Sequence, residues 1–128
     1  MTELRRILHI EDDPSIQAVT KLALEAIGGY EVLSCSSGAQ ALEEVEAFAP
    51  DFILLDVMMP DMDGPQTLLK LRERIDLARI PVTFMTAKVQ PSEIEHLRKL
   101  GARDVIVKPF DPMLLAEQIR NIWLTDQY

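Results

Sequence analysis

Short runs of aliphatic and β-branched residues recur along this chain, and longer segments of mixed polarity separate them. The runs cover residues 7–10, 30–34, 52–55, 82–85 and 105–107. Runs this short and this apolar are typical of strands buried on both faces. In the intervening segments apolar residues recur every three or four positions, as amphipathic helices require. The pattern therefore predicts an α/β fold of five strand–helix units, in which helices cover both faces of a five-stranded parallel sheet.

Prolines mark the expected helix starts. In the first turn of a helix the missing N–H of proline needs no partner, and its fixed φ already fits. Four dipeptides place a proline at such a start, namely Asp13-Pro14, Gly64-Pro65, Gln90-Pro91 and Asp111-Pro112. Ser92 and Glu95 also have the spacing of a capping box. Glycines stand where helices should stop, at positions 28, 29 and 101.

Length and composition limit what the chain can be. It has 128 residues, of which 48% are hydrophobic and 27% charged, so we expect one soluble domain over residues 1–128 and no output domain. No apolar run approaches the roughly 18 residues of a membrane span, and the N-terminus lacks a signal-peptide pattern. The single cysteine, Cys35, cannot form an internal disulfide, so a cytoplasmic location is expected.

The charge is negative and unevenly distributed. A net charge of −8 argues against direct binding to nucleic acid or to an anionic membrane surface. Between Leu22 and Leu69 there are nine acidic residues and no Lys, Arg or His. We interpret most of these acids as a solvated surface, although an acidic half could also attract a cation or a basic partner.

Chemically capable side chains stand at the carboxyl ends of four predicted strands. They are Glu11, Asp12 and Asp13 after the first strand, Asp56 after the third, Thr86 after the fourth and Lys108 after the fifth. Parallel strands end at one edge of the sheet, so we expect these groups in one crevice. Clustered carboxylates require a cation, and hard oxygen donors suit Mg²⁺. Asp56 could act as a nucleophile toward phosphorus, with Lys108 and Thr86 holding the phosphoryl oxygens.

Taken singly, each of these residues has an ordinary structural explanation. Asp13 is best explained as a helix cap, and Asp61 and Asp63 as turn residues. A threonine at a strand end or a surface lysine is equally ordinary. The joint placement on four strand ends favours a site, because a structural explanation would need four coincidences at one edge of one sheet. Outside this set, we expect His9 to be a hydrogen-bonded or half-buried core residue and Trp123 to pack at the sheet margin.

Four stretches of the sequence match a known family. They are residues 7–14 (ILHIEDDP), 55–64 (LDVMMPDMDG), 85–87 (MTA) and 107–110 (VKPF). In this order and spacing they resemble the receiver domain of two-component response regulators, over essentially the whole chain. The resemblance implies a flavodoxin-like fold, which agrees with the five strand–helix units.

The resemblance also implies a role for each site residue. Asp56 matches the phosphoacceptor, and Glu11 and Asp12 match the acidic pair that holds Mg²⁺. Met58 matches the position whose backbone carbonyl completes the metal shell. Thr86 matches the hydroxyl that moves onto the phosphoryl group, and Lys108 the lysine that pairs with it. The phosphodonor would be a phosphohistidine on a sensor histidine kinase or a histidine phosphotransfer protein, and the output a downstream protein partner.

One position departs from the family pattern. Members often carry an aromatic residue three positions before the lysine, and its ring turns inward when the threonine moves. Here that position is Val105, which has no ring to rotate. The usual aromatic switch is therefore not expected, although the shift of Thr86 could still carry a signal.

Two other classes of protein share part of this pattern. Phosphatases and phosphotransferases of the haloacid dehalogenase type also use a strand-end aspartate, a threonine, a lysine and Mg²⁺. Their nucleophile is followed two residues later by a second aspartate, where this chain has Met58. A flavodoxin-like electron carrier would need a glycine- and hydroxyl-rich phosphate loop after the first strand, and the acids at 11–13 would repel a flavin phosphate.

Overall fold

The computed structural model describes residues 3–87 and 90–127 and contains a sheet of five parallel strands in the order β2-β1-β3-β4-β5. The strands are β1 (Arg6–Ile10), β2 (Glu31–Cys35), β3 (Phe52–Asp56), β4 (Val82–Thr86) and β5 (Asp104–Val107). Each lies within one residue of the bounds expected from the sequence. All four residues from Ile7 to Ile10 in β1 and every residue of β3 and β4 are buried, which explains their uninterrupted apolar runs.

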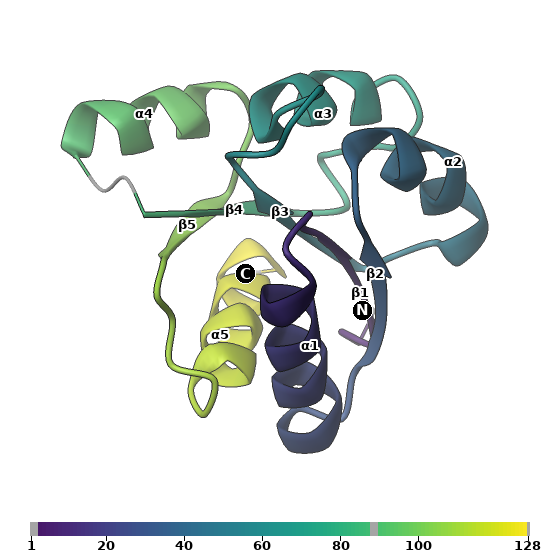
Figure 1. Cartoon of the computed structure of the whole chain (residues 1–128), viewed down its shortest axis with the longest axis vertical. Helices are drawn as coiled ribbons and strands as arrows, with labels where there is room; N and C mark the ends of the chain where they lie inside the picture. The colour runs from purple at the N-terminus through teal and green to yellow at the C-terminus, as the bar shows by residue number, and fades with distance from the viewer. Residues whose placement is uncertain (1–2, 88–89, 128) are drawn as a thin grey trace.

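Helices cover both faces of the sheet, as Figure 1 shows. They are α1 (Pro14–Leu22), its π-helical continuation η1 (Ala23–Ile27), α2 (Gly38–Phe48), α3 (Gly64–Leu71), α4 (Pro91–Lys99) and α5 (Leu115–Gln127). Helices α1 and α5 lie on one face and α2, α3 and α4 on the other (Figure 1). The predicted α/β architecture is confirmed. Among the described residues, no helix combines the length and the apolarity needed to cross a bilayer.

Two apolar cores form because side chains of a strand alternate between the faces of the sheet. On one face, Leu8 and Phe84 pack with residues of α2, α3 and α4 such as Leu68. On the other face, Ile7 and Leu54 belong to a cluster with η1 and α5. Trp123 belongs to this second cluster, which confirms that it packs against the sheet.

The helix starts follow the prolines in three of four cases. Asp13 caps α1 by accepting from the N–H groups of Ser15 and Ile16, so the cap interpretation is confirmed. The fourth expectation is wrong. Pro112 lies in a turn, and α5 begins at Leu115. The Asp111 carboxylate accepts from the N–H of Met113 at 2.9 Å, so that aspartate stabilises the turn rather than the first turn of the helix.

The capping-box expectation for Ser92 and Glu95 is also wrong. Gln90 is the N-cap of α4 and makes no side-chain cap hydrogen bond, which places Ser92 already inside the helix. A capping box is present instead at the start of α3. There the Asp63 carboxylate accepts from the Gln66 N–H at 2.8 Å, and the Gln66 side chain accepts from the Asp63 N–H at 3.0 Å. Asp63 is thus a structural residue, as expected.

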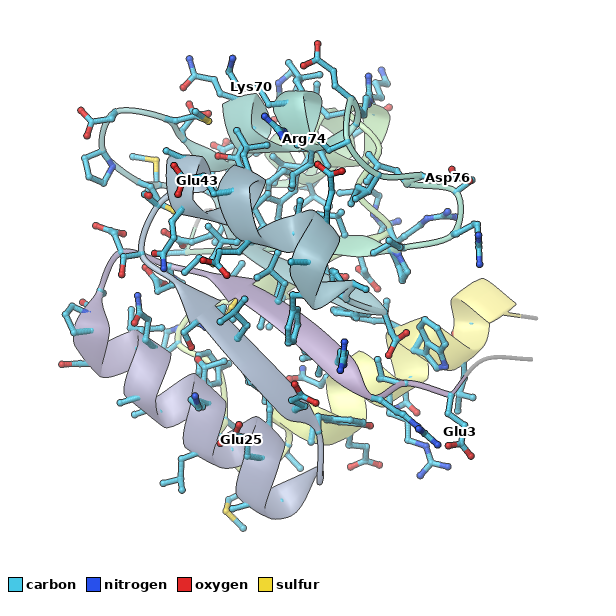
Figure 2. The ribbon with its side chains drawn as sticks, turned by 90° about the vertical axis from the view of Figure 1, so that its right-hand side faces the viewer. Glu3, Glu25, Glu43, Lys70, Arg74 and Asp76 are labelled. Carbon is cyan, nitrogen blue, oxygen red and sulfur yellow. The ribbon has the colours of Figure 1, made fainter. Side chains whose placement is uncertain are left out.

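Acidic and basic side chains separate onto neighbouring helices. Glu43 projects from α2, whereas Lys70 projects from α3 and Arg74 follows that helix (Figure 2). All three are exposed. At the surface, Arg74 forms an ion pair with Glu46 of α2 at 3.3 Å. Exposed pairs of this kind contribute less than about 1 kcal/mol to stability. The acidic side chains of α2 are exposed to water and form a solvated surface, as expected.

Candidate functional site

The carboxyl ends of β1, β3, β4 and β5 bring the expected residues to one edge of the sheet. Glu11 follows β1, Asp56 and Thr86 are the last residues of β3 and β4, and Lys108 follows β5. Strands β1 and β3 are neighbours, but the chain continues from β1 to β2 on one side and from β3 to β4 on the other. Ligands of such sheets bind at this topological switch point.

Two of the acids at this edge, Glu11 and Asp56, are buried and held by one cation. Glu11 is 1% exposed and Asp56 is 3% exposed. The Lys108 Nζ lies 2.7 Å from Glu11 Oε1 and 2.5 Å from Asp56 Oδ1. Charge-assisted hydrogen bonds of this kind are among the stronger polar contacts in proteins. Lys108 therefore offsets part of the cost of burying two carboxylates.

Burial and charge act in opposite directions on the two carboxyl groups. Burial raises the pKa of Asp56 above its usual range, and the Asp12 charge adds to this, whereas Lys108 opposes the rise. Burial likewise raises the pKa of Glu11 against the effect of Lys108. For Lys108, burial alone would lower the pKa, but its bonds to both carboxylates outweigh burial and the pKa is raised. A further cation beside these acids would favour their charged forms.

Three carboxylates fit a hard divalent cation. One carboxylate oxygen from each of Glu11, Asp12 and Asp56 lies within 4.8 Å of the others. Asp12 is exposed while the other two are buried, so such an ion would sit between the protein and solvent. Mg²⁺ prefers oxygen donors and keeps several waters, which suits this arrangement. The structure thus brings together the acids that the sequence suggested as a metal site.

The loop after β3 returns to the backbone at the end of that strand. Gly64 donates its N–H to the Val57 carbonyl at 2.9 Å. A Cβ at Gly64 would lie 2.4 Å from the Asp56 carbonyl oxygen, so the close approach requires glycine here. Asp61 adopts a positive φ of 66°, which confirms its role as a turn residue. Met58 lies in this loop with its side chain exposed, and the expected role of its carbonyl stays a prediction.

Thr86 and Val105 lie on the same face of adjacent strands. Val105 pairs with Phe84, and Thr86 pairs with Val107. Thr86 is 3% exposed, and its carbonyl accepts from the Lys108 N–H at 2.9 Å. Val105 is half-buried and packs against the core beneath α3 and α4. The valine is thus part of the packing of this face, next to the strand that carries the threonine.

His9 differs from the expectation in one respect. It is a fully buried core residue, but neither ring nitrogen has the expected hydrogen-bond partner among the described residues. Burial, together with the charge of Lys108, lowers the pKa of the ring to about 3, so the ring is neutral. A buried, neutral ring agrees with a structural role.

Gln17 belongs to the surroundings of the site, although the sequence did not single it out. From α1 it donates to the Glu11 main-chain carbonyl and to the Ser36 hydroxyl. A lone glutamine in an amphipathic helix carries no pattern that separates it from surface residues. Its position one turn after the Asp13 cap, close in the sequence to the end of β1, would have been the available signal.

Comparison with known proteins identifies the family. Residues 7–120 match the family model described as the response regulator receiver domain. This chain belongs to that family. The receiver domain is 35% identical over 122 residues to the transcriptional regulatory protein CseB of Streptomyces avermitilis. This alignment covers 95% of this chain and 50% of CseB. It is 34% identical over 118 residues to the alkaline phosphatase synthesis transcriptional regulatory protein PhoP of Bacillus subtilis, covering 92% of this chain and 48% of PhoP.

Solved structures agree with this assignment. The chemotaxis protein CheY4 of Vibrio cholerae superposes with a TM-score of 0.86 at 27% identity, covering 94% of this chain and 99% of that one. A CheY-like receiver domain protein from Methanospirillum hungatei gives a TM-score of 0.84 at 28% identity, with 98% of both chains covered. The flavodoxin-like fold is therefore confirmed. The receiver domain spans about half the length of the curated relatives it matches and nearly all of CheY4.

Proposed function

We propose that this receiver domain accepts a phosphoryl group on Asp56 from a phosphohistidine of a sensor histidine kinase or a histidine phosphotransfer protein. The observation that carries the proposal is the position of Asp56. It ends the central strand β3, is 3% exposed, lies 2.5 Å from the Lys108 ammonium and shares a 4.8 Å cluster with Glu11 and Asp12. In a receiver domain, a carboxylate so placed is the best nucleophile at the site.

The chemistry is a displacement at phosphorus. A carboxylate oxygen of Asp56 forms the new P–O bond, and the P–N bond to the donor imidazole breaks. The electron pair of that bond returns to the imidazole nitrogen. Lys108 and the Thr86 hydroxyl are the groups of this chain that can stabilise the phosphoryl oxygens, because both stand at neighbouring strand ends.

Glu11, Asp12 and Asp56 would hold Mg²⁺, with the Met58 carbonyl as a further ligand. When bound, the ion supplies positive charge to the phosphoryl oxygens. The proposed chemistry includes phosphorylation and dephosphorylation of the domain itself and no turnover of an external substrate. We further propose that phosphorylation switches the conformation of the domain and so regulates a downstream protein, in the cytoplasm and without direct contact to nucleic acid or membrane.

Intact-mass measurement tests the acceptor. Acetyl phosphate with Mg²⁺ should add one phosphoryl group to the wild type, and none after removal of Mg²⁺ by EDTA. Asp56→Asn should remain unlabelled. Asp61→Asn removes the same charge from an exposed turn and serves as the matched control, which should label like the wild type. Labelling of Asp56→Asn equal to that of the control would overturn the assignment.

A further inference from the structure

Hydrogen bonds of Gln17, Ser36 and Gln40 link α1, the β2–α2 loop and α2 beside Glu11. Gln17 Nε2 on α1 donates to the Glu11 main-chain carbonyl and, at 3.2 Å, to Ser36 Oγ. The Ser36 N–H in turn donates to Gln40 Oε1 of α2 at 2.7 Å. Gln17 is half-buried, and its bond to the Glu11 carbonyl is partly shielded from water, whereas the two bonds of Ser36 are exposed.

The main chain of Glu11 is consequently fixed on both sides. Its N–H donates to the Cys35 carbonyl at 2.9 Å, and its carbonyl accepts from Gln17. That carbonyl belongs to the peptide group that joins Glu11 to Asp12. The orientation of this one peptide plane sets the directions in which the two acidic side chains leave the backbone.

The two acids depend on that peptide to different degrees. The Glu11 carboxylate is also held by Lys108 at 2.7 Å and by the Asp13 N–H at 3.2 Å. The exposed Asp12 carboxylate makes no hydrogen bond within residues 3–87 and 90–127. Its position therefore rests on the backbone, and a loosened peptide would displace it first.

We infer that Gln17 is a positioning residue, which orients the Glu11–Asp12 peptide so that the acidic pair can bind a divalent cation. Gln17 acts through that peptide and touches neither the cation nor the phosphoryl group. The inference rests on the proposed function, since it concerns the same metal site. An amide suits this role because it donates a hydrogen bond without adding a positive charge that would compete with the cation.

Magnesium titration by calorimetry tests the inference on the full chain. Gln17→Met keeps an unbranched side chain that favours a helix and removes the donor. Partners of this kind around metal ligands typically change affinity by roughly 10–100-fold, and we expect about a tenfold weaker Mg²⁺ affinity. Gln118→Met makes the same change at an exposed position of α5 and should bind like the wild type. Gln17→Ala is the second variant, with the same expected loss, should Gln17→Met fold poorly.

Two further measurements separate positioning from a purely structural role. Urea unfolding in EDTA should give Gln17→Met nearly the wild-type stability, and saturating Mg²⁺ should restore its phosphorylation by acetyl phosphate. Wild-type Mg²⁺ affinity in the variant, or a loss of stability in EDTA without a loss of affinity, would overturn the inference while leaving the proposed function intact. Failure of the wild type itself to bind Mg²⁺ would instead overturn the proposed metal site, and the inference with it.

Discussion

Lys108 Nζ lies 2.5 Å from Asp56 Oδ1 and 2.7 Å from Glu11 Oε1, so one ammonium group bridges two carboxylates. Asp56 ends β3 and Glu11 follows β1, and both are almost fully buried. Neither carboxylate is screened by bulk water, and each therefore depends on a nearby cation to remain charged. The stability of the metal-free protein and the chemistry of the site are linked through this one lysine.

Lys108→Met should destabilise the protein in EDTA at neutral pH by about 3 kcal/mol, because it leaves two buried carboxylates without their cation. Removal of the ammonium raises the folded pKa of both acids further above their unfolded values. A raised carboxyl pKa gives stability that is present at low pH and lost as pH rises, so the variant should recover in mildly acidic buffer. Urea titrations at the two pH values measure this, and equal deficits at both would contradict it. Added Mg²⁺ should also restore part of the loss.

Asp12→Asn should weaken Mg²⁺ binding strongly without lowering the stability of the metal-free protein. The Asp12 charge raises the pKa of Asp56, so its removal relieves repulsion within the cluster. Calorimetric Mg²⁺ titration and urea unfolding in EDTA provide the two readings, with Asp61→Asn as the charge-matched control. Unchanged Mg²⁺ affinity would place the ion elsewhere.

Thr86→Ala should keep phosphorylation but lose most of the conformational response, whereas Val105→Ala should change that response little. A hydrogen bond from the hydroxyl to a charged phosphoryl oxygen contributes about 1.5–3 kcal/mol, enough to shift a two-state balance roughly tenfold or more. Val105 has no ring that could alternate between two positions. Amide NMR shifts of α4, with and without beryllofluoride, report the response. Retention of these shifts in Thr86→Ala, together with their loss in Val105→Ala, would refute this account.

Thr83→Val should stabilise the protein by about 1 kcal/mol, because the fully buried Thr83 hydroxyl has no hydrogen-bond partner among the described residues. Thr67 provides the matched comparison. Its equally buried hydroxyl donates to the Asp63 carbonyl at 2.7 Å, so Thr67→Val should instead lose stability. Thermal unfolding of both variants measures the difference. Destabilisation by Thr83→Val would show that the hydroxyl is satisfied in solution.

The Cys35 thiol should react slowly in the folded protein. It is fully buried, and burial, aided by the charge of Glu44, raises its pKa to about 11. The reactive thiolate is therefore scarce at neutral and mildly alkaline pH. Ellman's reagent should label the native protein slowly, and urea should increase the rate in step with unfolding. Rapid labelling of the native protein at neutral pH would contradict the burial of this thiol.

The sequence by itself determined the strands, three of the four helix starts marked by proline, and the edge of the sheet where the site lies. Buried strands must be apolar on both faces, so the run 52–55 predicts β3 to within one residue. Proline has few allowed positions, so Asp13-Pro14 predicts the start of α1. Parallel topology then places Asp56 and Lys108 at one edge without any knowledge of distances.

Tertiary structure decided what depends on contacts between distant segments. Spacing alone suggested a capping box at Ser92, but the cap of α4 is Gln90, and the capping box forms at Asp63. The bridge from Lys108 to Glu11 joins positions 97 residues apart, and no local pattern encodes it. The same holds for Gln17, whose amide becomes informative once folding brings it to the Glu11 carbonyl. Local sequence limits backbone conformation, whereas these hydrogen bonds form because packing fixes where separate strands and helices end.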